Sequence, residues 1–186
     1  MLEEGGVDTV VAQGAEAGRH RGTFTGSFED AMIPTRDLAR AVTAAVRIPV
    51  IATGGIMDGS DLAAVMALGA SAAQLGTAFL PCPECGTAEA HKRAILAARQ
   101  DTTVITRAFS GRPARGLAND FITRLKGRED VILPYPLQNV LTRVMRTAAA
   151  KRGDGEFLSL WAGQGVTRAR AMPARDLVRR LVEEMR

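Results

Sequence analysis

Aromatic side chains are scarce in this sequence, because only 4% of its 186 residues are Phe, Trp or Tyr. Proteins that bind single-stranded nucleic acids stack bases on aromatic rings, so the composition argues against that class. Blocks of Lys and Arg are also missing, although the net charge is +4. We therefore expect no nucleic-acid partner and interpret the excess arginine as a solvated helical surface. A basic rim that attracts an anionic ligand is the alternative.

Cysteine is equally rare. Cys82 and Cys85 have the CxxC spacing of redox motifs and of half a zinc site. No second pair follows, and His91 alone cannot complete four zinc ligands, so we expect two thiols in a reducing cytoplasm and no metal. A run of about eighteen apolar residues is absent, and so is a basic segment followed by an apolar one at the start. These absences predict no membrane span, no signal peptide and a cytoplasmic location.

Two apolar runs that end in glycine, at 49–56 and 71–79, are the most informative feature present. A helix rich in small residues, 59–68, lies between them, which is the pattern of a parallel βαβ unit. Glycine at the carboxyl end of a strand lets the backbone approach a ligand and point its N–H groups at an anion. In a (β/α)₈ barrel the turns after the last two strands often form a phosphate site. The pattern therefore predicts a phosphate-bearing cofactor or substrate.

The first part of the chain reads as a parallel α/β sheet. Its elements alternate along the chain: strand 7–13, a glycine-rich loop 14–26, helix 34–46, strand 48–53, helix 59–68 and strand 71–79. Such connections are right-handed, so the strands should lie side by side with their loops on one edge. We expect Gly18, Gly55 and Gly76 to converge there.

The pattern changes after Pro81, and two regions follow from it, 1–81 and 82–186. The second region is predicted to be mainly helical and to pack on the first. Its expected helices are 89–99, 119–125, 137–151 and 173–186, with one extended piece at 102–108. About three parallel strands cannot close a barrel, which needs eight. We therefore expect an α/β fold, the C-terminal part of a TIM-type (β/α)₈ barrel.

The loop 13–22, Gln-Gly-Ala-Glu-Ala-Gly-Arg-His-Arg-Gly, places His20 at the mouth of a strand. From the residues alone, His20 is equally a catalytic base or a hydrogen-bonded loop histidine. With the two glycine turns and the segments 110–116, 135–139 and 160–164, this loop resembles the nitronate monooxygenases, also called 2-nitropropane dioxygenases. These are FMN-dependent barrels that oxidise alkyl nitronates.

The resemblance implies FMN as cofactor, a nitronate or nitroalkane as substrate, and molecular oxygen as the second substrate. It makes His20 the catalytic base. The implied cofactor contacts are Gln13 and Gly18 at the flavin, and Gly55, Gln74, Leu75, Gly76 and Thr77 at the phosphate. The chain departs from the family pattern at Arg19, where a small residue is common. Arg19 and Arg21 flank His20, and their charge should lower its pKa.

Several other side chains have two interpretations. Tyr135 lines the substrate pocket or only packs, and Trp161 and Gln164 close the barrel bottom or approach the flavin. His91 is expected at the surface. Three arginines face an anionic ligand or pair with the protein's own carboxylates: Arg107, Arg112 and Arg115.

Family members carry about as much chain again before the residue that is Met1 here. We therefore expect a fragment, a truncated product, or a chain that self-associates or needs a partner for the missing half. The resemblance implies an FMN oxidoreductase that converts nitronates to a carbonyl compound and nitrite. Two alternatives stay open: an NAD(P)H:quinone reductase on the same scaffold, and an inactive remnant that only binds phosphate or a nucleotide.

Overall fold

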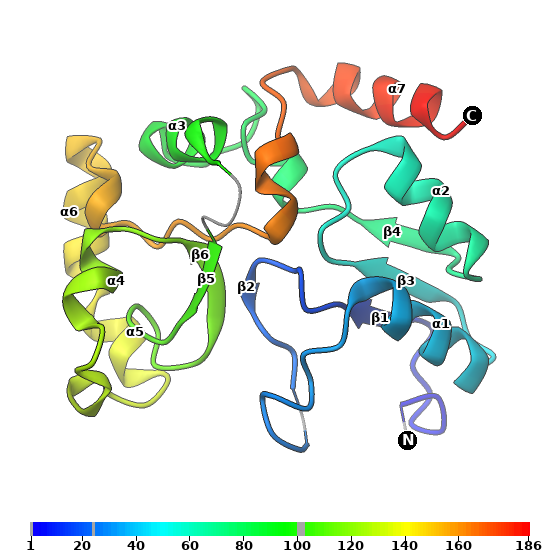
Figure 1. Ribbon diagram of the computed structural model, residues 1–186, viewed down its shortest axis with the longest axis horizontal. Helices are drawn as coiled ribbons and strands as arrows, with labels where there is room; N and C mark the ends of the chain where they lie inside the picture. The colour runs from blue at the N-terminus through cyan, green and yellow to red at the C-terminus, as the bar shows by residue number, and fades with distance from the viewer. Residues whose placement is uncertain (1, 24, 100–102) are drawn as a thin grey trace.

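The structure is a computed structural model that describes residues 2–23, 25–99 and 103–186. A parallel sheet lies in the first half of the chain. Its strands β1 (Val10–Gln13), β3 (Val50–Thr53) and β4 (Ala72–Gln74) lie in the order β1-β3-β4 (Figure 1). Val10 pairs with Val50, and Ile51 pairs with Ala72. The predicted parallel order is confirmed. The third strand is shorter than predicted, because the chain turns into the 3₁₀ helix η1 (Thr77–Phe79).

Two helices pack against this sheet, α1 (Thr35–Ala45) and α2 (Gly59–Ala67). Ala39 of α1 and Ala52 of β3 are completely buried, and small side chains of this kind let helix and strand backbones come close. Helix α2 begins at Asp58, whose side chain accepts a hydrogen bond from the Asp61 amide. Both helices agree with the predicted ranges to within two residues.

A second sheet is the main difference from the sequence prediction. Strands β2 (Arg19–His20), β5 (Thr103–Thr106) and β6 (Ala114–Leu117) form an antiparallel sheet in the order β2-β6-β5. β5 falls within the predicted extended piece 102–108. The sheet crosses the predicted boundary at 81, because His20 pairs with Ala114. Phe24 of the predicted loop and Thr102 of the predicted extended piece lie outside the described residues.

The remainder of the chain is mainly helical: α3 to α6 lie beside the second sheet, and α7 lies over α2 (Figure 1). Its α-helices are α3 (Glu89–Ala97), α4 (Asp120–Leu125), α5 (Leu137–Leu141), α6 (Arg143–Arg152) and α7 (Ala174–Glu184). Its 3₁₀ helices are η2 (Glu129–Val131), η3 (Gly155–Phe157) and η4 (Gln164–Arg168). Within the described ranges, no helix has the length and apolar character needed to cross a membrane.

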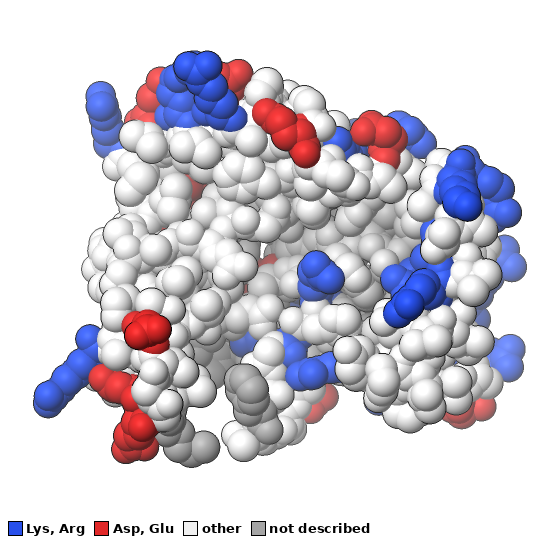
Figure 2. Space-filling model, turned by 180° about the vertical axis from the view of Figure 1, so that it is seen from behind, with Lys and Arg blue, Asp and Glu red and all other residues white. Residues whose placement is uncertain are grey.

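Charged side chains are dispersed over the face drawn in Figure 2. Lys and Arg form several separate groups there rather than one continuous basic patch, and Asp and Glu lie mostly along the top and at the lower left of the view. This distribution agrees with the interpretation of the positive net charge as a solvated surface on that face.

The C-terminal helix α7 docks on the amino end of α2. Leu177 and Leu181 are buried in this contact, and the Gly59 amide donates to Glu184 Oε2 at 3.1 Å. A Cβ atom on Gly59 would lie 2.3 Å from the Leu181 carbonyl oxygen, which is closer than packing allows. Gly59 is therefore what permits α7 to lie against α2.

Replacing Gly59 with Ala should push α7 away from α2. The clash is with backbone atoms, so we expect the free energy of unfolding to fall by about 1–3 kcal/mol. Urea denaturation followed by circular dichroism measures this. Gly86→Ala is the matched control, because no described atom lies within 4 Å of a Cβ built there. Equal stability of the two variants would contradict this account of the docking.

Candidate functional site

An open pocket of about 1490 Å³ runs along the open side of β1 and reaches the loops that follow β1, β3 and β4. Seven of the eight predicted site residues line it: Gln13, Gly18, His20, Gly55, Gln74, Gly76 and Thr77. The loops after β1, β3 and β4 therefore converge as predicted. The eighth residue, Leu75, packs its side chain against the apolar clusters under the sheet.

The two glycine turns differ in why they contain glycine. Gly54 and Gly55 have φ angles of 123° and 69°, which L side chains rarely adopt. Gly76 has a φ of −110°, and no described atom lies within 4 Å of a Cβ built on it. Glycine at 76 is thus required neither by conformation nor by packing within this chain. Gly76 lines the pocket, so the space over its backbone is open to a ligand.

Three residues that line the pocket have backbone amides that are unpaired within the described chain. The N–H groups of Gly55, Ile56 and Gly76 donate to no acceptor among the residues that the structure places. The Thr77 hydroxyl accepts from the Gly163 amide at 2.9 Å, so its own hydrogen is left to donate. Several N–H donors with no side chain between them form the kind of concavity that binds phosphate.

The amino end of α2, in contrast, is filled by carboxylates. Asp58 accepts from the Asp61 amide at 3.0 Å, Asp61 accepts from Met57 at 3.0 Å, and Glu184 accepts from Gly59 at 3.1 Å. These groups satisfy the first amides of the helix. The free N–H donors that could bind an anion are therefore those of the glycine turns and not those at the amino end of α2.

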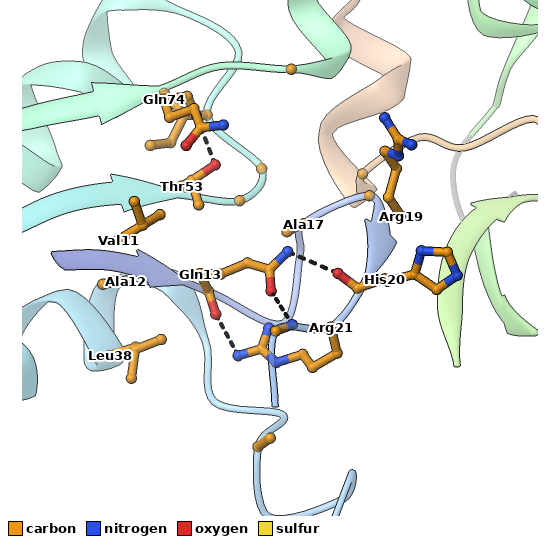
Figure 3. A pocket seen from close by; sticks show the side chains of 18 of the residues that line it. Val11, Ala12, Gln13, Ala17, Arg19, His20, Arg21, Leu38, Thr53 and Gln74 are labelled. Carbon is orange, nitrogen blue, oxygen red and sulfur yellow. Dashed lines mark hydrogen bonds between the residues drawn. The ribbon is translucent and has the colours of Figure 1, made fainter. Parts of the chain in front are cut away.

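Gln13 organises the loop that carries His20. Its Nε2 donates to the His20 carbonyl at 3.1 Å, and its Oε1 accepts from the Gly22 amide at 2.8 Å. Arg21 donates to the Gln13 carbonyl. Figure 3 shows Gln13 reaching from β1 to the His20 backbone, with the imidazole on the far side. Gln13 thus shapes this loop, and its contact with a flavin stays a prediction.

Gly18 is held by backbone packing. A Cβ atom on Gly18 would lie 2.7 Å from the carbonyl carbon of Ala162 and 2.8 Å from the nitrogen of Gly163. Only glycine therefore lets the loop after β1 lie against residues 162–163. Its predicted flavin contact is likewise still a prediction.

The His20 imidazole lies in a partly buried polar and aromatic environment. Its Nε2 is 2.7 Å from the Oγ of buried Ser110, and that hydroxyl is 3.0 Å from the Arg112 carbonyl. When Ser110 donates to this carbonyl, it accepts from His20 Nε2–H and leaves Nδ1 with a free lone pair. The rings of Tyr135 and Trp161 lie 6.0 and 5.8 Å from the imidazole, between centroids.

The pKa of His20 lies below its usual value. Burial is the main cause, and the charges of Arg112 and Arg19 add to it. His20 is therefore neutral near pH 7 and able to accept a proton. Ser110 was not among the residues singled out from the sequence; its only signal was its place in the segment 110–116.

The prediction of a surface position for His91 is wrong. This side chain is half-buried, lines the same pocket, and lies 3.1 Å from the Trp161 carbonyl through Nε2. Burial lowers its pKa, and the hydrogen bond opposes the shift. A helix with charged neighbours gave no indication that its histidine faces inward.

The three arginines with two interpretations, Arg107, Arg112 and Arg115, donate hydrogen bonds to backbone carbonyl groups. Arg107 donates to Gly111, Arg112 to Arg21 and Thr23, and Arg115 to Ala15, in each case at a carbonyl oxygen. None of the ion pairs found among the described residues includes them. The predicted pairing with carboxylates is therefore not what the structure shows.

Metal ligands do not gather in this site. Nowhere in the part of the chain that the structure describes do three His, Cys, Asp or Glu side chains come together in a group that could hold a metal ion. Cys82 and Cys85 are free thiols, and burial raises the pKa of Cys82.

A family model for nitronate monooxygenase matches residues 1–184. The chain belongs to the nitronate monooxygenase family. It is 46% identical to a nitronate monooxygenase of Pseudomonas aeruginosa, over 100% of the chain and 53% of that protein. It is 42% identical to a probable nitronate monooxygenase of Staphylococcus saprophyticus, over 98% of the chain and 52% of that protein.

Two solved structures are similar to this chain. A nitroalkane oxidase from Streptomyces ansochromogenes superposes with a TM-score of 0.90 at 49% identity, over 99% of this chain and 53% of that one. FabK from Thermotoga maritima superposes with a TM-score of 0.80 at 33% identity, over 100% and 56%. The chain thus spans about half the length of the nitronate monooxygenases it matches.

Arg19 is the place to test the electrostatics of this site. Its φ is 67°, the one positive φ outside glycine among residues with a described backbone. Arg19→Gly should raise the pKa of His20, because a nearby positive charge is removed. Glycine relieves the backbone strain at this position, which stabilises the folded state by about 1 kcal/mol. It also makes the unfolded chain more flexible, which destabilises the folded state by about as much, so the free energy of unfolding should change little.

The measurement is an NMR pH titration of the two histidines, with His91→Gln used for assignment. Arg19→Lys keeps the charge and should leave the pKa of His20 nearly unchanged. If Arg19→Gly and Arg19→Lys give the same pKa, the charge of Arg19 does not act on His20.

Proposed function

We propose that this chain is the C-terminal half of an FMN-dependent (β/α)₈ barrel that oxidises alkyl nitronates with molecular oxygen to a carbonyl compound and nitrite. One observation carries the proposal. A neutral, partly buried His20 and a cradle of unpaired amides line the same pocket. His20 would serve the neutral nitroalkane, whose deprotonation gives the nitronate that is oxidised. The family and the names of its relatives support the reaction.

The open edges of the parallel sheet support the partial barrel. No further strand pairs with β1 or β4 within the described ranges. Val11 of β1 is apolar yet 49% exposed, and Leu38 and Val42 of α1 line the same open pocket. Apolar strand edges and helix faces of this kind need a cover. Further βα units, as in the longer relatives, would supply it.

FMN fits the residues that are present. Its phosphate carries close to two negative charges and would take the amides of Gly55, Ile56 and Gly76 with the hydroxyl of Thr77. The space over Gly76 leaves room for this approach. When bound, the flavin supplies the acceptor for the substrate's electrons and the partner for oxygen. The chain itself would bind the phosphate and accept one proton from the substrate.

That proton is the one on the carbon beside the nitro group. A neutral imidazole can accept it, and the contact between His20 Nε2 and Ser110 fixes the orientation of the ring. Tyr135 and Trp161 flank the imidazole and would confine a small alkyl chain. An NAD(P)H:quinone reductase on this scaffold would not require the proton transfer, so the role of His20 separates the two reactions.

Gly76→Val tests the phosphate cradle. The added side chain would occupy the open space over Gly76 and block the amides, and each lost charge-assisted hydrogen bond costs about 1.5–3 kcal/mol. We expect FMN affinity, measured by quenching of flavin fluorescence, to fall at least tenfold. Gly86→Val is the control, since Gly86 also has free space but does not line the pocket. Unchanged FMN affinity in Gly76→Val would place the phosphate elsewhere.

His20→Asn tests the chemistry, in a protein that joins this chain to the front half of a nitronate monooxygenase. Loss of general-base catalysis typically costs about 10²–10⁴-fold in turnover. We expect that loss with neutral nitroalkane, and a far smaller one with the ready-made nitronate, with the flavin still bound. Equal loss with both substrates would show that His20 orients the substrate. No loss with either, together with NAD(P)H-dependent quinone reduction, would favour the reductase.

A further inference from the structure

The 3₁₀ helix η4 touches both glycine turns. At its start, the Gly163 amide donates to Thr77 Oγ1 at 2.9 Å, which fixes the turn after β4. A Cβ atom on Gly165 would lie 2.9 Å from the Gly55 carbonyl oxygen and 2.4 Å from Met57 Cγ. η4 therefore lies directly against the turn after β3 and spans the two walls of the cradle.

Arg168 ends this helix with a three-way contact. Its Nη1 lies 2.7 Å from Asp58 Oδ2 and 2.7 Å from Asp61 Oδ2, and its Nη2 donates to the Gly55 carbonyl at 2.9 Å. The fork of a guanidinium can hold a carbonyl and two carboxylates at once, whereas an ammonium group cannot match this geometry.

This contact has two consequences for the cradle. Holding the Gly55 carbonyl fixes the peptide plane on which the neighbouring Ile56 amide lies. The positive charge of Arg168 offsets part of the negative charge of Asp58 and Asp61, which reduces their repulsion of an anion bound at the adjacent turn. Without Arg168 the same turn would be both looser and more negative.

We propose that Arg168 is a positioning residue for the phosphate of the flavin: it clamps the Gly55 turn and offsets part of the negative charge of Asp58 and Asp61 beside it. The proposal rests on the proposed FMN function, and it assigns a part of the C-terminal region to cofactor selection. Arg168 itself need not touch the cofactor. It should therefore matter for FMN, which carries the phosphate, and not for riboflavin, which lacks it.

The test is the affinity of the chain for FMN and for riboflavin, both measured by quenching of flavin fluorescence. In Arg168→Gln we expect FMN to bind about tenfold more weakly, as for the loss of one charge-assisted contact, with riboflavin unchanged. Arg170→Gln is the matched control. It removes a 2.8 Å ion pair with Glu184, which keeps its ion pair with Arg180, and should change neither affinity.

The outcomes separate the two proposals. If the unsubstituted chain binds FMN no more tightly than riboflavin, the phosphate site of the proposed function is wrong. A clear FMN preference that persists in Arg168→Gln overturns the role of Arg168 alone, and so does equal weakening of both flavins. If circular dichroism shows that Arg168→Gln is unfolded, Arg168→Lys replaces it. That variant keeps the charge but loses the fork, so its FMN preference should fall, and an unchanged preference contradicts the proposal.

Discussion

Glu16, through its carboxylate, its carbonyl and its Cβ, contacts three segments on which the site depends. It accepts from the Thr35 amide at 2.8 Å and from the Thr35 hydroxyl at 2.6 Å, which ties the loop after β1 to the start of α1. The Glu16 carbonyl accepts from the Gln164 amide at 2.9 Å, which ties the same loop to η4. A Cβ atom on Gly55 would lie 2.9 Å from Glu16 Cβ, so the turn after β3 closes against this side chain as well. The positions of His20 and of the glycine turns are thus set from one place.

The site has two parts on either side of Glu16, one suited to proton transfer and one suited to anion binding. On one side lies His20, which burial and two arginines keep neutral. On the other lie turns whose amides are unpaired among the described residues, next to a helix end that carboxylates already fill. Placing carboxylates beside an anion site is unfavourable unless a cation offsets them. Arg168 lies beside both carboxylates and supplies a positive charge there. A residue near the end of the chain is thus connected to the two glycine turns, the most informative feature of the sequence.

The parallel sheet and its glycine turns could be predicted from the sequence, because apolar runs, small-residue helices and glycine recur with the spacing of βα units. The antiparallel sheet could not. β2 has only two residues, and its partner Ala114 lies far along the chain, so no local periodicity marks the pairing. Ser110 and the inward position of His91 depend on the same long-range folding. Gly76 shows a different case: the sequence predicted close approach of a ligand, and the structure leaves room over its backbone for one.

The central claim is that an anion binds the amides of the two glycine turns. It is tested most directly by titrating the isotopically labelled chain with FMN and following the backbone amide resonances by NMR. We expect the largest shifts at Gly55, Ile56, Gly76 and Thr77, with small shifts at the capped amides of Asp61 and Gly59, because carboxylates already hold those. Shifts concentrated at the start of α2, or none at the glycine turns, would contradict the account.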